Sequence, residues 1–186
     1  MHLPKQWEEN GSTANVYAFI KYLSSQHPEN SLTAVSNGAC CVVGNQTYVI
    51  KKGSRMANNS AVASMGYGLP AAIGSLLVII VWSSCKFIII LPSPSRHIVV
   101  LLPPPIQVPI AAGSIMMNLQ ELQTIITNKL PIKVFLINNN GYHSIRLTQN
   151  NLFKEHCKIG IGPESGDLSF PEFNKICYAY AEYFSY

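Results

Sequence analysis

The chain has 186 residues, of which 48% are hydrophobic and only 12% are charged. This length and composition fit one domain with a sizeable core and exclude a largely disordered chain. The small charged fraction indicates that some apolar surface faces a partner or a second domain. The net charge of +4 comes without a dense run of Lys or Arg, which argues against nucleic-acid binding.

The five cysteines are irregularly spaced and form no C-x-x-C pair, so a disulfide framework or a zinc site is not expected. Cys40 and Cys41 lie in an apolar stretch, which favours small buried residues over nucleophiles. Residues 1–10 are polar and contain no apolar segment of a secretory signal. We therefore expect a cytoplasmic location.

The first 75 residues predict alternating helices and strands. Apolar side chains at helical spacing predict a helix over Asn15–Gln26, with Asn15 as its cap. Leu32–Ser36 is typical of a short buried strand and ends at the turn pair Asn37-Gly38. Thr47–Lys51 is a second strand candidate. Ala61–Ser75 is rich in small residues and predicts a helix that lets a neighbouring helix or a ligand approach closely.

Residues 75–112 differ in style from the rest of the chain. They hold six of its twelve prolines and only two charges, Lys86 and Arg96. Three interpretations remain open: a buried strand-loop-strand unit, a weak transmembrane segment over Leu76–Leu91, or sequence that did not evolve in this reading frame. Lys86 and the prolines that follow weaken the membrane interpretation.

Regular patterns return at Gly113. Ser114 is a candidate cap for a helix. Ile132–Ile137 is nearly continuous in apolar residues, as in a parallel strand buried on both faces, and it runs into the turn 138–141. Further helices are predicted from near Tyr142 and over Glu172–Tyr180. The inner side of the helix after Ser114 is expected to carry Met117, Leu119, Leu122, Ile125 and Ile126.

The order of these segments predicts an α/β three-layer sandwich with a mainly parallel sheet. Ligands in such sheets bind at the carboxyl ends of the strands, where the turn 138–141 falls. That turn is also explained by the preference of Asn and Gly for positive φ alone. Met116-Met117 favour core packing, and His143 and His156 favour surface or packing roles over catalysis. The aromatic tail Tyr178–Tyr186 predicts an interface that is left uncovered.

Three segments together carry a resemblance. They are Ser64–Gly74, Gly113–Leu122 and Leu136–Gly141. In this order, with a helix and a strand between the last two, they resemble thiamine diphosphate enzymes of the acetolactate synthase type. The motif of that family runs Gly-Asp-Gly-Ser, a helix, a strand, and Asn-Asn. Ser114 and Asn139 are 25 positions apart, as in the family.

The resemblance implies a site for thiamine diphosphate and Mg²⁺, whose hard oxygen ligands suit a diphosphate-bound metal. Asn139 and the backbone carbonyl of Gly141 match metal ligands. Met65 matches an apolar residue that holds the cofactor bent. The implied cofactor-binding residues are Asn37, Gly38, Ser64, Met65, Gly113, Ser114, Asn139 and Gly141.

The chain departs from the family motif in one place. Ala112 stands where the family has its metal-binding aspartate, and Ala111 stands at the preceding glycine. The resemblance covers about residues 13–74 and 113–180 and fails between them, so we expect one domain over 13–180 that contains an aberrant or inserted segment, 75–112. A frameshift, a misassigned intron or a decaying gene would explain such a segment.

The implied function is binding of thiamine diphosphate and Mg²⁺ in an enzyme that carboligates or decarboxylates a 2-keto acid such as pyruvate. The family's catalytic glutamate comes from a separate pyrimidine-binding domain on a partner subunit, and Glu121 does not match it. We therefore assign no catalytic residue, leave enzyme activity open, and expect little activity from this part alone. Relatives are homo-oligomers. The alternatives are a non-catalytic remnant or interaction module that keeps the fold, and a membrane-anchored protein.

Overall fold

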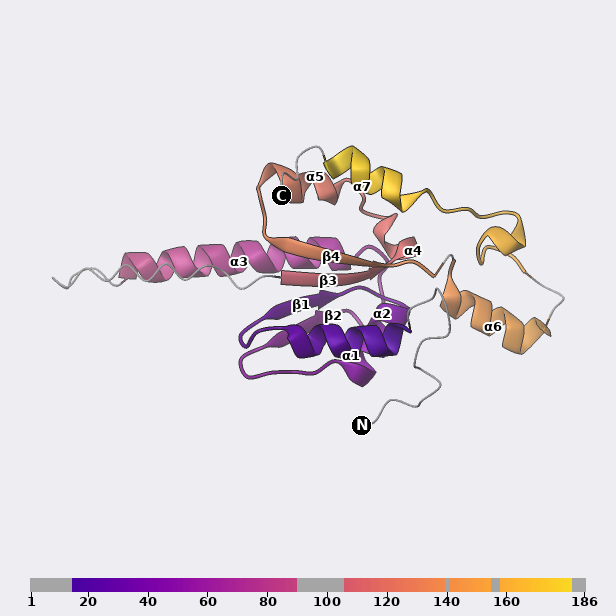
Figure 1. The fold of residues 1–186 in the computed structure, drawn as a ribbon, viewed down its shortest axis with the longest axis horizontal. Coiled ribbons are helices and arrows are strands. Elements are labelled where there is room, and N and C mark those ends of the chain that lie inside the picture. Colours follow the sequence, from indigo (N-terminus) through magenta and orange to yellow (C-terminus); the bar gives the residue numbers. More distant parts are fainter. Residues whose placement is uncertain (1–14, 90–105, 140, 155–157, 182–186) are drawn as a thin grey trace.

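The computed structural model describes residues 15–89, 106–139, 141–154 and 158–181, which form one parallel sheet with helices around it (Figure 1). The order of the described strands is β2-β1-β3-β4. The strands are β1 (Leu32–Val35), β2 (Arg55–Asn58), β3 (Ile106–Ala111) and β4 (Ile132–Ile137). The helices are α1 (Val16–Gln26), α2 (Ala39–Thr47), α3 (Gly68–Ile89), α4 (Ala112–Ile115), α5 (Glu121–Thr127), α6 (His143–Phe153) and α7 (Phe173–Ala181), with a 3₁₀ turn at Pro163–Ser165.

Helices cover both faces of the sheet. On one face, α1 and α2 pack together, and the Phe19 ring of α1 meets the Phe135 ring of β4 edge to face at 5.9 Å. On the other face, α3 packs on β1 and β3, and α5 lies between α3 and α7 (Figure 1). The predicted three-layer α/β sandwich with a mainly parallel sheet is therefore confirmed.

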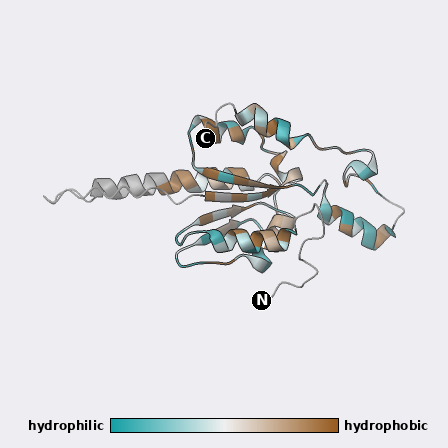
Figure 2. Cartoon of the chain, viewed as in Figure 1, coloured by the Kyte–Doolittle hydropathy of each residue, from teal (hydrophilic) through white to brown (hydrophobic). Residues whose placement is uncertain are grey.

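The main core lies between the sheet and the layer of α3, α5 and α7. Every second residue from the start of β3 faces this core, because successive side chains of a strand point to opposite faces of the sheet. Ile106, Val108, Ile110 and Ala112 all have 0% exposure. Figure 2 shows hydrophobic residues on β3 and β4 and on the adjoining part of α3. Burying each large aliphatic side chain stabilises the fold by roughly 1.5–3 kcal/mol.

The strands are all parallel, but the order in which the chain adds them to the sheet changes direction between β1 and β3. From β1 the chain crosses through α2 to β2 on one side, and then through α3 to β3 on the other side of β1. The loops that follow β1 and β3 therefore diverge and leave a crevice at the carboxyl ends of these strands. Helix α6 lies beyond this end of the sheet (Figure 1).

The N-terminal third agrees with the sequence except at one segment. Asn15 caps α1, since its Oδ1 accepts hydrogen bonds from the N–H groups of Tyr17 and Ala18. The strand predicted at Thr47–Lys51 is wrong. Thr47 ends α2, whose buried residues include Cys40 and Val43 at helical spacing, and the second strand follows later at Arg55–Asn58. Helix α2 was not predicted, because it is short and contains a glycine.

The segment 61–75 is only partly helical. Residues 59–67 form a loop, and α3 begins at Gly68 and continues to Ile89, past the predicted end. The strand-loop-strand interpretation of 75–112 is thus wrong in its first half, which is helical, whereas its second half contains β3. Residues 90–105 lie outside the described part, so the prediction of an inserted segment stays a prediction there. Among the described helices, none is long and apolar enough to cross a membrane.

Strand β3 contains a proline, which explains why the sequence did not mark it clearly. Leu32 and Thr33 of β1 pair with residues 106 and 107 of β3, and the regular pairing stops there. Pro109 has no N–H to continue the ladder, although its carbonyl still accepts from Ser36 N at 3.2 Å. A proline within a central strand is uncommon.

The C-terminal half corrects two further predictions. Ser114 lies inside the single-turn helix α4 and caps no helix. The helix predicted after it is broken, and only its second part, α5, carries the buried Ile125. Met116 and Met117, which were expected in the core, are 36% and 50% exposed because they lie in the break between α4 and α5. Helices α6 and α7 lie close to their predicted positions.

Strand β4 has the predicted bounds, Ile132–Ile137, but not the predicted burial. In the described sheet it is an edge strand, and its residues are half-buried apart from the exposed Lys133. Val134 and Leu136 pack on the core cluster, while Phe135 faces α1. An edge strand has a neighbour on one side only, and its side chains are therefore less covered than those of a central strand.

Three polar side chains join the end of α1, strand β1 and the end of α2, on the face of the sheet that α1 and α2 cover. The Tyr48 hydroxyl lies 2.6 Å from Thr33 Oγ1 and 2.7 Å from His27 Nδ1. Thr33 and His27 are almost completely buried. Burial raises the pKa of Tyr48 and outweighs the opposite effect of its hydrogen bond with Thr33, so the phenol stays protonated. This hydroxyl therefore satisfies two buried polar groups at once.

Replacing Tyr48 with Phe tests this group. We expect Tyr48→Phe to lower the free energy of unfolding by about 1–3 kcal/mol, since Thr33 and His27 lose their common partner in the interior. Urea denaturation followed by circular dichroism measures the change. Tyr22→Phe is the control, because Tyr22 is 67% exposed and should be neutral. Equal stability of the two variants would contradict the assignment.

Candidate functional site

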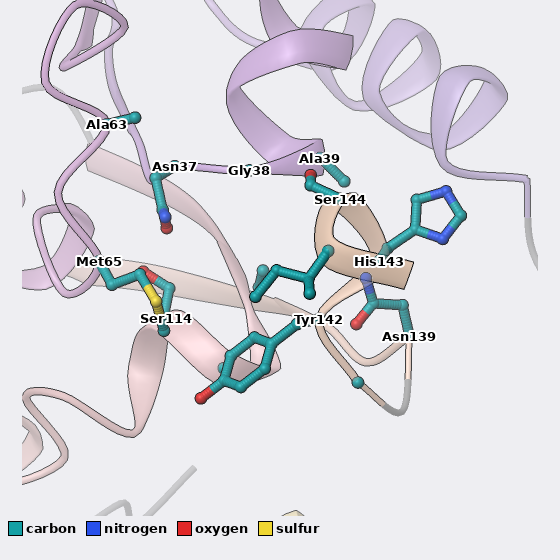
Figure 3. A pocket seen from close by; sticks show the side chains of 14 residues that line it. Asn37, Gly38, Ala39, Ala63, Met65, Ser114, Asn139, Tyr142, His143 and Ser144 are labelled. Atoms are coloured by element: carbon teal, nitrogen blue, oxygen red, sulfur yellow. The ribbon is translucent and has the colours of Figure 1, made fainter. Parts of the chain in front are cut away.

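A cavity of about 250 Å³ opens at the carboxyl ends of the parallel strands, between β1 and β3, where the strand order changes direction. Its walls come from the segments that follow all four strands (Figure 3). Ligand pockets usually measure about 300–1,000 Å³, so this one suits a small ligand or one end of a larger ligand. It is lined by Asn37, Gly38, Ala39, Ala63, Met65, Ala111, Gly113, Ser114, Asn139, Gly141, Tyr142, His143, Ser144 and Ile145.

Ser114 connects three of these segments. Its hydroxyl lies 2.5 Å from the hydroxyl of Ser36 at the end of β1, and it accepts a hydrogen bond of 2.8 Å from the N–H of Gly66. Both serines are almost completely buried. Because the two central strands and the loop after β2 are joined through this one oxygen, the wall of the cavity is fixed by side-chain polarity as well as by packing.

The loop that carries Met65 is held by hydrogen bonds to both backbone groups of Gly66, its N–H and its carbonyl. Asn118 donates to the Gly66 carbonyl at 2.7 Å, in addition to the bond from Gly66 N to Ser114. Gly66 has φ +87°, and a Cβ there would meet Asn118 and Met117, so only glycine fits. This clamp places Met65, which is 37% exposed, beside Ser114 on one side of the cavity (Figure 3).

Asn139 stands across the cavity from Met65 and Ser114 (Figure 3). Its Oδ1 atom is buried and has no hydrogen-bond partner. A buried acceptor without a partner costs about 1–3 kcal/mol, and it is usually explained by a ligand, a water or an ion. This orphaned oxygen is the one observation on the cavity wall that points directly to a bound group.

The loop 158–167 fixes Gly141 and the start of α6. Tyr142 N donates to the carbonyl of Ile161, and a Cβ at Gly141 would overlap the same carbonyl oxygen. Gln149 holds both backbone groups of Ile159. The close approach explains why position 141 is a glycine.

Charged groups of the same loop lie behind the cavity. Asp167 accepts from the Ser165 hydroxyl and from Gly160 N, and these two bonds hold the pKa of its carboxyl below the usual value. Arg146 of α6 forms an ion pair with Glu164 of the loop, with 2.5 Å between Nε and Oε1. The loop therefore anchors α6, none of whose own side chains is buried.

The electrostatic environment favours an anion. Helix α2 begins at Ala39 after Gly38, helix α6 begins at His143 after Tyr142, and no side chain caps either N-terminus. Both N-termini contribute lining residues to the cavity. The free N–H groups of a first helical turn carry partial positive charge. Two such ends at one cavity suit a phosphate group.

The structure brings together seven of the eight predicted cofactor-binding residues. Ser64 is the exception: it is exposed, and its hydroxyl accepts from Asn59. The seven are Asn37, Gly38, Met65, Gly113, Ser114, Asn139 and Gly141. His143 is exposed, and its ring points away from the cavity centre (Figure 3).

Seven lining residues were not predicted. Ala39 and Ala63 have small side chains without polar groups, and nothing in the sequence marks them, whereas Ala111 was noted only as standing at a glycine of the family motif. The others, Tyr142, His143, Ser144 and Ile145, form the start of α6. The sequence did contain a sign of these four residues, because a helix was predicted to begin directly after the Asn-Gly turn at the end of a strand, where ligands bind.

Ala111 and Ala112 face different surroundings. Ala111 lines the cavity, whereas Ala112 has 0% exposure and belongs to the apolar core cluster with Ile110. The sequence placed the missing aspartate at Ala112. In the folded chain this methyl group points into the core, and position 111 is the one that touches the cavity.

Residues 105–182 match the family described as thiamine pyrophosphate enzyme, C-terminal TPP binding domain. The match includes β3, β4 and the turn with Asn139. The chain is similar to the C-terminal thiamine pyrophosphate-binding domain of acetolactate synthase-like enzymes. The sequence resemblance is thereby confirmed.

Relatives across most of the chain are acetolactate synthases. The large subunit of isozyme 1 from Escherichia coli is 26% identical over 75% of this chain, and that of isozyme 2 is 25% identical over 80%. The chloroplastic enzyme of Arabidopsis thaliana is 31% identical over 73%. The matched segments cover 21%, 24% and 17% of these proteins, so the chain spans about a fifth of the length of its curated relatives.

The domain contains a buried cysteine, Cys40, in the first turn of α2, directly after the cavity-lining Ala39. Burial raises the pKa of its thiol to about 12, and the neighbouring Cys41 adds to the effect against a backbone hydrogen bond. A thiol that stays protonated is a poor nucleophile. Because the folded state favours the neutral thiol, its contribution to stability is complete below about pH 9 and is lost as the pH rises towards 12.

Alkylation tests this environment. In the folded domain at pH 8, iodoacetamide should modify the exposed Cys177 and leave Cys40 unmodified. In denaturant, both should react. Peptide mapping by mass spectrometry assigns the modified positions. Labelling of Cys40 in the folded domain at the rate of Cys177 would show that Cys40 is accessible and ionised.

A second prediction concerns Gly113. A Cβ at this position would overlap the ring of Tyr142, so Gly113→Ala should destabilise the domain by about 1–3 kcal/mol. Gly74→Ala is the matched control, because its Cβ meets nothing within 4 Å and the residue lies inside α3. That change should be neutral or stabilise by up to about 1 kcal/mol. Thermal unfolding compares the two, and Tyr142→Ala should relieve the cost of Gly113→Ala if the contact is its cause.

Proposed function

We propose that the cavity binds the diphosphate end of thiamine diphosphate together with Mg²⁺, and that this domain supplies the cofactor site of an enzyme acting on a 2-keto acid such as pyruvate. The orphaned Oδ1 of Asn139 carries the proposal. A cation at this oxygen would satisfy it, and the diphosphate would hold that cation from the other side. Asn139 Oδ1 and the carbonyl of Gly141 are the proposed protein ligands of the metal.

The phosphate oxygens would lie against the two helix N-termini. Gly38 and Ala39 offer the start of α2, and His143 and Ser144 offer the start of α6. Gly113 lets the backbone approach closely on the third side, with Ser114 behind it. Asn37 and Met65 lie across the cavity from Asn139 (Figure 3), and we propose that they contact the part of the cofactor beyond its diphosphate. Ser64 is left out of this arrangement.

When bound, thiamine diphosphate would supply a nucleophilic carbon for chemistry at the carbonyl of a keto acid. The domain's part is to bind the diphosphate, keep the cofactor in place and exclude water from the apolar side of the cavity. None of the described lining residues is a carboxylic acid. We therefore propose that this domain alone turns over little or no substrate and that the acid or base comes from another domain or subunit.

A partner would find apolar surface next to the cavity. Ile145, which lines the cavity, is 46% exposed, and Leu152 and Phe153 further along α6 are 69% and 55% exposed. Residues 145, 152 and 153 lie on one side of the helix by their spacing. A second domain or a second copy that covers this side would also close the open end of the cavity, in keeping with the small charged fraction of the sequence.

A non-catalytic domain that keeps the fold and binds no cofactor is the second candidate. Ala112 favours it, because the metal aspartate is missing and the methyl group is built into the core. The two candidates differ in one measurable property, namely whether the domain still binds thiamine diphosphate.

Calorimetric titration of the domain with thiamine diphosphate in the presence of Mg²⁺ decides between them. We expect saturable binding, and little binding of thiamine, which lacks the diphosphate. Asn139→Ala should weaken thiamine diphosphate binding by about tenfold or more, since it removes the proposed metal ligand. Asn151→Ala, on the exposed side of α6, is the matched control and should leave the affinity unchanged. Absence of binding to the unchanged chain would favour the non-catalytic candidate.

A further inference from the structure

A second cavity, of about 850 Å³, lies between helix α3 and the edge strand β2. It reaches the loops that precede β1 and β2, at the end of the sheet opposite α6 (Figure 1). The candidate cofactor cavity lies at the carboxyl ends of the strands, and the two cavities share no lining residue. The volume of the second cavity is within the usual range of small-molecule pockets, about 300–1,000 Å³. The domain therefore has room for a second ligand, away from the first site.

Two small residues at the margin of the sheet create this hollow. Leu32 and Ala34 of β1 pair with Arg55 and Ala57 of β2, and residues paired in this way point to the same face of the sheet. Ala34 belongs to the core cluster that contains residues of α3, so Arg55 and Ala57 also point to the α3 side. Helix α3 packs on β1 and β3, and it brings Gly74 to the cavity that Ala57 lines. A Cβ at Gly74 would meet nothing within 4 Å, so the space beside β2 stays open.

The walls of the second cavity include several aliphatic side chains. Leu32 and Ile79 pack against the core cluster and also line the cavity. Val78, which lines the cavity beside Ile79, is 66% exposed. Covering hollowed apolar surface of this kind removes it from water, which favours a ligand with an apolar body.

The surroundings of the second cavity are positively charged. Arg55 lines the cavity and is exposed, and its guanidinium makes no ion pair or hydrogen bond with any described residue. The sequence between positions 29 and 55 contains three cationic residues, Lys51, Lys52 and Arg55, against one carboxylate, Glu29. A guanidinium offers N–H donors in a planar fork, which matches the oxygens of a carboxylate, a sulfonate or a phosphate. The charge therefore favours an anionic group on the ligand.

We infer that this second cavity binds an organic anion with an aliphatic body. The body lies along Leu32, Val78 and Ile79, and the anionic group meets the guanidinium of Arg55. A neutral apolar ligand would leave Arg55 without a partner, and a small inorganic anion would leave the aliphatic walls in water. The inference does not depend on the cofactor assignment, because the two cavities lie at opposite ends of the strands.

Sodium octanoate is the probe for this site, titrated by calorimetry into the whole chain at low ionic strength. We expect octanoate to bind saturably, and acetate, which has the charge without the chain, not to bind saturably. 1-Octanol, which has the chain without the charge, should bind about three- to fivefold more weakly than octanoate, because an exposed ion pair contributes modestly. Octanoate that does not saturate would overturn the inference, as would equal affinities for octanoate and 1-octanol.

Filling the hollow locates the octanoate site. Gly74→Leu should fold with unchanged or higher thermal stability, because the space at Gly74 is open and leucine favours a helix. Its side chain should occupy the cavity and abolish octanoate binding. Gly74→Ala is the matched control, since it adds only one methyl group and should keep most of the affinity. Unchanged octanoate affinity in a folded Gly74→Leu variant would show that octanoate binds elsewhere and would overturn the inference.

Reversing one charge tests the contact with the anionic group. Arg55→Glu should weaken octanoate binding by about tenfold or more, because it replaces an attraction by a repulsion. Lys175→Glu changes the net charge equally at an exposed position on α7 and should change the affinity by less than about twofold. Equal effects of the two variants would overturn the contact with Arg55. Displacement of octanoate by thiamine diphosphate with Mg²⁺ would place octanoate in the cofactor cavity and would likewise overturn the inference.

Discussion

The hydrogen bond between Ser36 and Ser114 is the contact on which the site depends. The two residues follow the central strands β1 and β3, whose loops diverge because the chain changes direction between them. A crevice at such a point would otherwise be bounded by free loops. Since Ser114 also accepts from Gly66, one buried oxygen fixes the loop after β2 as well, and the positions of Met65 and Gly113 follow from it. The same polar junction is buried beneath the cavity wall, so the scaffold and the candidate site are stabilised together.

The wall of the cavity combines donors and acceptors of unequal strength. The backbone N–H groups at the two helix N-termini are hydrogen-bond donors in fixed positions. Among the described acceptors, one buried oxygen has no partner, the Oδ1 of Asn139. Such an arrangement is preorganised for an anion, because the donors need no rearrangement when it binds. The apolar side chains on α6 extend this wall outwards, and a partner placed on them would remove water from the same site.

The sequence predicted those parts of the fold that depend on local patterns. The helix after Asn15 carries a capping signal and the strand β4 a run of apolar residues, and both were found where expected. Helix α2 was missed because it is short, and strand β3 was left unclear because it contains Pro109. This proline is tolerated because its own carbonyl still accepts a hydrogen bond from Ser36 N. Seven site residues could be predicted from motif spacing. The alanines and Ser64 could not be placed, because pocket lining depends on backbone direction rather than on residue type.

The two alanines after β3 show this dependence most clearly. Side chains alternate along β3, and Ile106, Val108 and Ile110 all face the core. Ala112 continues that series at the first residue of α4, whereas Ala111 takes the opposite face and reaches the cavity. An aspartate at position 112 would have to turn its carboxylate out of the apolar cluster, because an unpaired buried charge is far more costly than a buried methyl group. An alanine at position 112 therefore fits the apolar core, and the described lining of the cavity contains no carboxylate.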